Sequence, residues 1–241
     1  MITGHDKMTV SVGTRKIDLI EWIYLAFTSI IGPLRKFLFE DAPSFKTRAL
    51  PPMKGDRNCV LVIDASGSMF DDDWKPTRLG AAVKAANTFA RRLRQETPNA
   101  RIAVVIFGCK AKVVCRLTTA REFRKISHQI DQIDVGGSTN MYAGFKKALG
   151  LLKDRVCTCQ VVLLTDGHSN GKNPEELANR LREFAIVECV GIGASPADVD
   201  EPLLRRISSA YPDGKKRYRW IGQKEQLIKH FHNLAGAIRR A

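Results

Sequence analysis

The stretch VLVIDASGSMFDDD, residues 60–73, joins an apolar run to a polar turn. Four apolar residues lead directly into Asp64, and Ser66 and Ser68 follow at alternate positions. A short continuous apolar run predicts a strand that is covered on both faces, as in a parallel sheet. A carboxylate and two hydroxyls directly after such a strand therefore predict a polar site at the edge of a sheet.

The rest of the chain alternates apolar runs with segments of helical periodicity. Parallel strands joined by right-handed helical crossovers form a doubly wound sheet. We therefore predict an α/β fold with a doubly wound, mostly parallel, six-stranded Rossmann-like sheet flanked by helices. The helix at 173–185 has Asn173 as its expected N-cap and Pro174 at its first position. The strands are expected at 59–64, 101–107, 111–117, 159–166, 186–193 and 217–222, and the other helices at 77–95, 120–131, 141–153, 199–210 and 224–240.

Three loops carry polar residues that would meet at the carboxyl ends of the strands. The first supplies Asp64, Ser66 and Ser68, the loop GGSTN supplies Thr139, and the loop LLTDG supplies Asp166. We expect Gly67 to allow a tight turn that points both serines the same way. Two carboxylates and three hydroxyls offer only oxygen, which hard divalent cations such as Mg²⁺ prefer. Each loop alone could simply cap a turn, but three together predict a metal site.

These motifs, in this order and beside these elements, resemble the von Willebrand factor A (vWA) domain and its metal-ion-dependent adhesion site (MIDAS). The resemblance covers residues 58–241 and implies the vWA fold. It implies that Ser66 and Ser68 bind Mg²⁺ (or Mn²⁺) directly and that Thr139 does so in an open state. Asp64 and Asp166 would then act mostly through water.

Hydroxyl ligands leave a cation under-neutralised, so it can accept a further acidic oxygen. The resemblance therefore implies a non-enzymatic module that binds a protein partner through the partner's Asp or Glu. Intracellular members of the family usually serve as such modules in multi-protein systems, so we expect an adaptor or scaffold.

Several other readings of the same loops remain open. Integrin β subunits place two acids after the serine motif and hold a second cation there, and Asp71, Asp72 and Asp73 match that spacing. The simpler interpretation of these acids is the start of a helix. His168 follows the third loop and could form a Ser66–His168–Asp hydrolase, although the G-x-S-x-G elbow is absent. A hydrolase that uses the same metal is a separate alternative. No phosphate-binding G-x-x-x-x-G-K-[ST] motif occurs in the sequence.

The chain is strongly basic, with 39 Lys and Arg against 25 Asp and Glu. From residue 205 onward there are ten basic residues against two acids, and GKKRYRW interleaves bases with aromatics. This composition suits an acidic partner or a nucleic acid. A nucleic-acid-associated scaffold that uses this basic C-terminal face is therefore the alternative function. The simpler interpretation is a solvated edge strand protected by its charges.

The six cysteines lie mostly within predicted buried strands and lack the paired spacing of a zinc site. We therefore expect structural thiols in a reducing, cytoplasmic location.

The N-terminal region is expected to be separate from the domain. An apolar stripe at helical spacing from Ile20 to Leu34 predicts an amphipathic helical arm over 1–39. Its uncharged core of about 13 residues is shorter than the roughly 20 that span a membrane. The arm could dock a partner or lie on a membrane surface. A linker over 40–57, rich in Pro and charge, would join it to a vWA domain at 58–241.

Overall fold

The structure, a computed structural model, describes residues 9–12, 15–18, 57–133, 136–152 and 157–237. By contacts the chain divides into one unit over 1–50 and a second over 51–241. The larger unit contains a six-stranded sheet in the order β5-β4-β3-β6-β7-β8, in which only β5 is antiparallel. The predicted doubly wound, mostly parallel sheet is therefore confirmed. Its strands are β3 (Arg57–Asp64), β4 (Arg101–Phe107), β5 (Ala111–Thr119), β6 (Thr158–Thr165), β7 (Ala185–Ile192) and β8 (Tyr218–Ile221).

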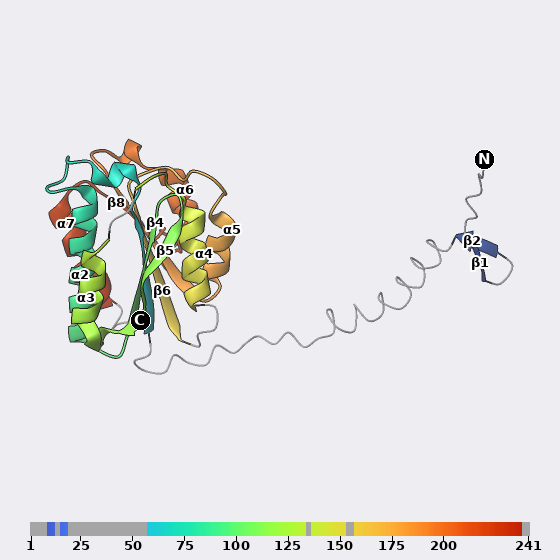
Figure 1. The fold of residues 1–241 in the computed structure, drawn as a ribbon, viewed down its shortest axis with the longest axis horizontal. Coiled ribbons are helices and arrows are strands. Elements are labelled where there is room, and N and C mark those ends of the chain that lie inside the picture. Colours follow the sequence, from blue (N-terminus) through green and yellow to red (C-terminus); the bar gives the residue numbers. More distant parts are fainter. Residues whose placement is uncertain (1–8, 13–14, 19–56, 134–135, 153–156, 238–241) are drawn as a thin grey trace. The chain divides into compact units, whose positions relative to one another are not determined.

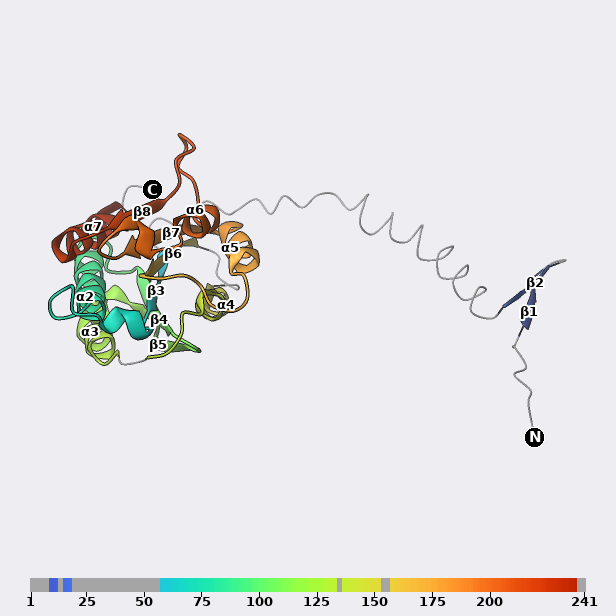
Figure 2. The same ribbon diagram turned by 90° about the horizontal axis from the view of Figure 1, so that it is seen from above.

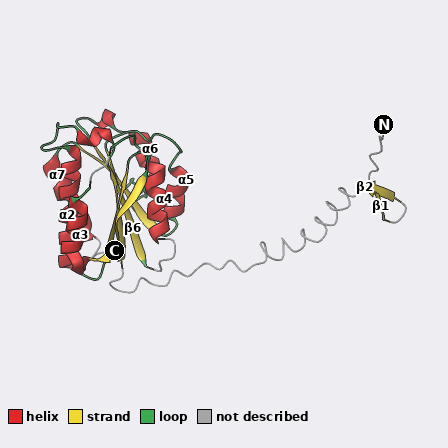
Figure 3. Ribbon diagram, viewed as in Figure 1, coloured by secondary structure: helices red, strands yellow, loops and turns green. Residues whose placement is uncertain are grey.

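Helices cover both faces of this sheet (Figures 1 and 3). Viewed from above, the same two helical layers enclose the strands (Figure 2). One layer holds α2 (Arg78–Glu96), α3 (Phe123–Asp131) and α7 (Lys224–Ala237), and the other holds α4 (Met141–Leu152), α5 (Glu175–Arg182) and α6 (Glu201–Ile207). Single turns of 3₁₀-helix occur at η1 (Gly67–Phe70), η2 (Ala120–Glu122) and η3 (Pro196–Asp198).

Strand β3 lies at the centre of the sheet and divides the core between the two layers. Leu61 and Ile63 pack toward α2 and α7, whereas Val60 and Val62 pack toward α4. All four side chains are fully buried. This alternation follows from the period of two in a strand, and complete burial explains why the run is apolar on both faces. The core therefore holds the end of β3 rigidly in place.

The sequence interpretation was wrong about how α5 begins. Pro174 is the N-cap, and the first helical residue is Glu175. The Asn173 side chain accepts a hydrogen bond from the Glu175 backbone N–H at 2.9 Å. This bond forms an Asx-turn directly before the helix.

The described part of the N-terminal unit is a β-hairpin. Strand β1 (Thr9–Val12) pairs antiparallel with β2 (Arg15–Asp18). This corrects the expected helical arm over 1–39 for these residues, where β-branched Thr9, Val10 and Val12 favour extended backbone. The apolar stripe from Ile20 to Leu34 lies outside the described residues. Within the described part of the chain, no helix is both long and apolar enough to cross a membrane.

A buried carboxylate lies between β7 and α7. Glu188 is 3% exposed, and burial raises its pKa to about 7. Two basic side chains lie close to this carboxylate. Arg217 Nη1 lies 3.8 Å from Glu188 Oε2, and His230 Nε2 lies 3.7 Å from Glu188 Oε1. Burial lowers the pKa of His230 to about 4, so the imidazole is neutral at pH 7 and offers Glu188 no counter-charge.

Glu188→Gln should become more stable relative to wild type as the pH rises from 4.5 to 7. A carboxyl whose folded-state pKa is raised stabilises the fold below its unfolded pKa, and that contribution is lost as the pH passes the folded pKa. The relative gain should reach up to about 3 kcal/mol above pH 7. Urea unfolding across this range measures it, with exposed Glu183→Gln as the matched control. A flat difference between Glu188→Gln and wild type would contradict this assignment.

Candidate functional site

Three loops meet at the carboxyl ends of the central strands. Asp64 ends β3, Asp166 directly follows β6, and Thr139 lies in the loop before α4. The loops are joined through their backbones: the Gly67 N–H donates to the Gly137 carbonyl at 2.9 Å. The Asn170 N–H donates to the Thr139 carbonyl at 2.6 Å. The predicted convergence is therefore present in the fold.

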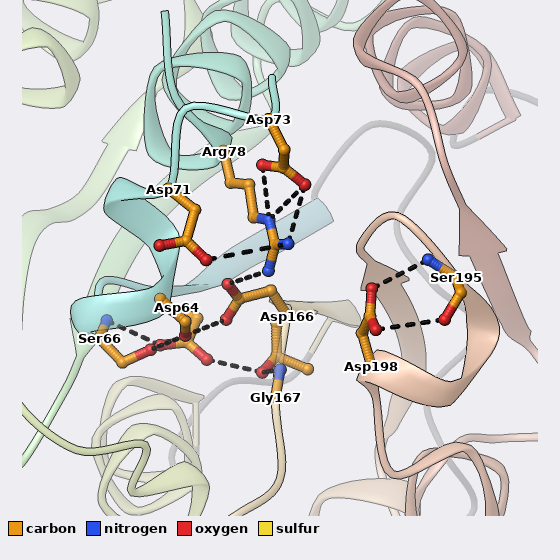
Figure 4. A network of polar contacts seen from close by, with 11 residues as sticks. Asp64, Ser66, Asp71, Asp73, Arg78, Asp166, Gly167, Ser195 and Asp198 are labelled. Atoms are coloured by element: carbon orange, nitrogen blue, oxygen red, sulfur yellow. Dashed lines mark hydrogen bonds and ion pairs between the residues drawn. The ribbon is translucent and has the colours of Figure 1, made fainter. Parts of the chain in front are cut away.

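Asp64, Ser66 and Asp166 lie together at this junction (Figure 4). The Ser66 and Ser68 hydroxyl oxygens are 3.3 Å apart, and the Ser68 hydroxyl donates to Asp166 Oδ1 at 2.9 Å. Thr139 is buried, and a Cβ built on Gly167 would lie 3.7 Å from its hydroxyl oxygen. The Ser66 and Ser68 hydroxyls and the Asp166 carboxylate thus lie together, and the Thr139 hydroxyl lies beside Gly167 in the third loop.

Asp64 is a fully buried carboxylate without an ion pair among the described residues. Its Oδ1 accepts the Ser66 backbone N–H at 2.9 Å, and its Oδ2 accepts the Thr165 hydroxyl at 2.6 Å. Burial still outweighs these bonds and raises its pKa to about 6. A buried negative charge of this kind calls for a nearby cation.

The donor set fits a hard divalent cation. Three hydroxyls and two carboxylates supply only oxygen, as Mg²⁺ and Mn²⁺ prefer. No group of three or more His, Cys, Asp or Glu side chains in the described ranges is arranged to hold a metal. A thiolate- or imidazole-rich site is therefore not an alternative within the described part of the fold.

Arg78 is a site residue that the sequence interpretation missed. It is the first residue of α2, its side chain is only 10% exposed, and its Nη1 donates to Asp166 Oδ2 at 3.0 Å. The same guanidinium binds both carboxylate oxygens of Asp73 at 2.8 to 3.1 Å, as Figure 4 shows. These carboxylates raise the pKa of Arg78 further, so it is permanently charged.

The acids after the serine motif do not form the start of a helix. Helix α2 begins only at Arg78, after Thr77 as its N-cap, and its first turn contains no acid. Asp73 binds Arg78 directly, and Asp71 Oδ2 lies 3.9 Å from Arg78 Nη2. The simpler interpretation placed a helix start at these acids, but the chain first forms η1 and a turn that bring the acids to the guanidinium of Arg78.

The glycine that the site needs most is Gly137. Gly67 begins the tight turn η1 and the Ser66 and Ser68 hydroxyl oxygens lie 3.3 Å apart, as expected, but the φ of Gly67 is not positive. Gly137 has a φ of 108°, and a Cβ there would lie 2.5 Å from Cys109 Sγ. Both the backbone conformation and the close approach of Cys109 therefore require glycine.

His168 lies at the rim of the site rather than in a catalytic arrangement. Its side chain is 64% exposed, and its Nδ1 is 3.8 Å from Asp200 Oδ2. Among the described residues it forms no hydrogen bond with Ser66, whose hydroxyl faces Ser68. The geometry does not favour a Ser–His hydrolase.

The basic C-terminal face is built around the edge strand β8, as predicted. The rings of Tyr218 and Trp220 pack against the core instead of facing solvent. Tyr211 is 41% exposed, but the Arg217 guanidinium covers its ring at 4.0 Å. The aromatics that suggested base stacking are thus largely engaged within the protein.

Of the six cysteines, four are buried (Cys59, Cys115, Cys159 and Cys189), Cys157 is partly buried and Cys109 is exposed. The buried ones lie within or beside the packed strands, where a thiol behaves as a small apolar side chain.

Known sequences resemble the larger unit. A family model described as von Willebrand factor type A domain matches residues 59–168. A UPF0353 protein of Mycolicibacterium gilvum (strain PYR-GCK) is 29% identical over 207 residues. The match covers 74% of this chain and 59% of that relative, so the chain spans about three fifths of the relative's length.

Solved structures share the fold. A von Willebrand factor type A protein from Catenulispora acidiphila superposes with a TM-score of 0.63 at 24% identity, over 77% of this chain and 43% of the other. Proximal thread matrix protein 1 from the mussel byssus, in a structure with a zinc-occupied MIDAS motif, gives a TM-score of 0.65 at 22% identity. That match covers 79% of this chain and 47% of the other.

Proposed function

We propose that this chain is a metal-dependent protein-interaction module, and the match of residues 59–168 to the von Willebrand factor type A domain model supports this proposal. Ser66, Ser68 and Thr139 hold a divalent cation with their hydroxyls, while Asp64 and Asp166 act from behind water. The partner supplies an Asp or Glu side chain to the cation. The observation that carries this proposal is the convergence of three oxygen-bearing loops around Asp64, a buried carboxylate that lacks a described ion pair.

In this proposal the hydroxyl residues bind the cation, and the two carboxylates partly neutralise its charge. A bound cation supplies a positive centre that accepts an additional acidic oxygen. Asp64 and Asp166 stabilise positive charge at the site, while hydrogen bonds to protein groups fix their carboxylates. The neutral serine hydroxyls leave that charge only partly compensated. A partner's carboxylate is therefore attracted, which suits an adaptor in a multi-protein system.

The metal we propose is Mg²⁺, or Mn²⁺ where it is available. Oxygen-only donors favour these hard cations over softer ones. A structural neighbour holds zinc at its corresponding motif, so Zn²⁺ belongs in the same titration. The physiological metal is the cation that occupies the site most fully at its free concentration in the cell.

Ser66→Ala should weaken Mn²⁺ binding at least tenfold, because it removes one proposed direct ligand while leaving the strand and turn intact. Electron paramagnetic resonance of free Mn²⁺ measures the affinity. Ser195→Ala is the matched control: this serine lies in the neighbouring loop and bonds to Asp198 instead. Equal Mn²⁺ affinity in Ser66→Ala and wild type would refute the metal site.

Partner capture separates this function from the basic-face alternative. EDTA and Ser66→Ala should each abolish a metal-dependent complex. A complex held by the basic face would ignore EDTA and weaken steeply with added salt.

A further inference from the structure

We infer that Arg78 acts as a built-in cation that orients Asp166 toward Ser68 and occupies the position where Asp71 and Asp73 would otherwise attract a second metal ion. This inference rests on the proposed metal-binding function. It adds a positioning residue that does not itself bind the metal, and it predicts that the site holds a single cation.

The first part of the argument is the geometry of the guanidinium. Its Nε and Nη2 bind the two oxygens of Asp73, and its Nη1 binds Asp166 Oδ2 at 3.0 Å. The two carboxylates thus occupy different edges of one rigid, planar group. Arginine makes such forked contacts, whereas lysine presents a single point charge.

The second part is what this contact does to Asp166. Its side chain is fully buried, with Oδ2 bound to Arg78 and Oδ1 accepting the Ser68 hydroxyl at 2.9 Å. Because both oxygens have fixed partners, the carboxylate plane cannot rotate freely. Oδ1 is therefore held beside the Ser68 hydroxyl, where it would act on a cation through water.

The third part is how Arg78 itself is held. Thr77 caps α2 by accepting the Gly80 backbone N–H at 3.0 Å, which sets the first turn of the helix. The Arg78 backbone N–H donates to the Asp71 carbonyl at 3.3 Å, which folds the preceding turn onto the helix. Arg78 is thus fixed both by its backbone N–H and by its guanidinium group.

The fourth part concerns the acids of the turn. Both Asp71 and Asp73 have an oxygen within 4 Å of the Arg78 guanidinium. A dication placed between them would meet this permanent positive charge at close range. Arg78 therefore neutralises these acids in a way that needs no metal.

The test is a double-mutant cycle with Mn²⁺ as the probe, using the full chain. Wild type, Asp73→Asn, Arg78→Gln and the double variant are titrated for stoichiometry and affinity by electron paramagnetic resonance. Wild type should bind one Mn²⁺. Asp73→Asn should bind it about tenfold more weakly, as outer-shell changes typically do. Arg78→Gln alone should bind a second, weaker Mn²⁺ at Asp71 and Asp73, and the double variant should not. For the first Mn²⁺ the double variant should match Arg78→Gln, because Asp73 affects that site only through Arg78.

A neighbouring residue supplies the control. Asp72→Asn changes the same chemical group one position away, where the side chain is 89% exposed and lies 4.0 Å from Lys75 Nζ. Its Mn²⁺ affinity should equal that of wild type. Arg78→Lys serves as a second variant if Arg78→Gln does not fold, and it should also bind more weakly because the fork is lost.

The outcomes separate the two proposals. One Mn²⁺ in wild type with unchanged affinity in Asp73→Asn would overturn the positioning role and leave the proposed function standing. Two Mn²⁺ ions in wild type, reduced to one in Asp73→Asn, would show that the acids bind a metal and overturn the built-in cation. A wild-type protein that binds no Mn²⁺ would refute the proposed function, and this inference with it.

Discussion

Alanine in place of Phe89 is expected to lower the free energy of unfolding by about 3–5 kcal/mol. Phe89 lies on α2, is fully buried, and meets the ring of Phe231 on α7 edge to face. The ring centroids are 6.3 Å apart with an interplanar angle of 72°. Truncation removes the apolar contacts, the ring pair and the support of two helices at once.

Urea unfolding at a fixed pH measures this loss from the midpoint and slope of the transition. Phe184→Ala is the matched control, because Phe184 is 36% exposed beyond the end of α5 and should change stability by about 0.5 kcal/mol. A loss below about 1 kcal/mol for Phe89→Ala would mean that α2 does not depend on this contact. Helix α2 also carries Arg78, so loosening it should disturb the site as well.

Asp64→Asn is expected to stabilise the metal-free protein while abolishing its stabilisation by Mn²⁺. Burial raises the pKa of Asp64 to about 6, so the ionised carboxylate destabilises the fold above that pH. Asparagine keeps the shape and can still accept the Ser66 N–H, and its amide can donate to the Thr165 hydroxyl. The gain at pH 8 should be about 2–3 kcal/mol, and it should vanish below the unfolded pKa.

Thermal unfolding with EDTA and then with Mn²⁺ measures both effects. Wild type should gain stability with rising Mn²⁺ by mass action, and Asp64→Asn should not. Asp213→Asn, a change on an exposed loop, serves as the control for the amide substitution. Equal Mn²⁺ stabilisation in both proteins would show that Asp64 does not support a cation.

The strands could be predicted from local sequence. The meeting of the three loops could then be predicted from the parallel arrangement of those strands. The run before Asp64 is apolar at every position, and parallel strands must end at a common edge. Asp64, Ser66, Ser68, Thr139 and Asp166 therefore lie together as predicted, and their roles toward a metal stay predictions.

The contribution of Arg78 could not be predicted in the same way. It is separated from Asp166 by 88 positions, and an arginine near a helix start carries no local signal for a buried ion pair. Gly137 was missed for a similar reason, since its need for glycine comes from Cys109 in another loop. The strands at Thr9–Val12 and Arg15–Asp18 were missed because the arm over 1–39 was predicted from the apolar stripe that begins at Ile20, outside these residues.

Both ends of the described domain lie far from the loops that carry Ser66 and Ser68. Arg57 at the start of β3 and Ala237 at the end of α7 line one shared cavity, at the edge where the parallel strands begin. An affinity tag, a surface for immobilisation or a second protein can therefore be fused to either end of the described domain without covering the loops that carry Ser66 and Ser68. The same arrangement makes the two ends easy to join, so a circularly permuted version should keep the site accessible.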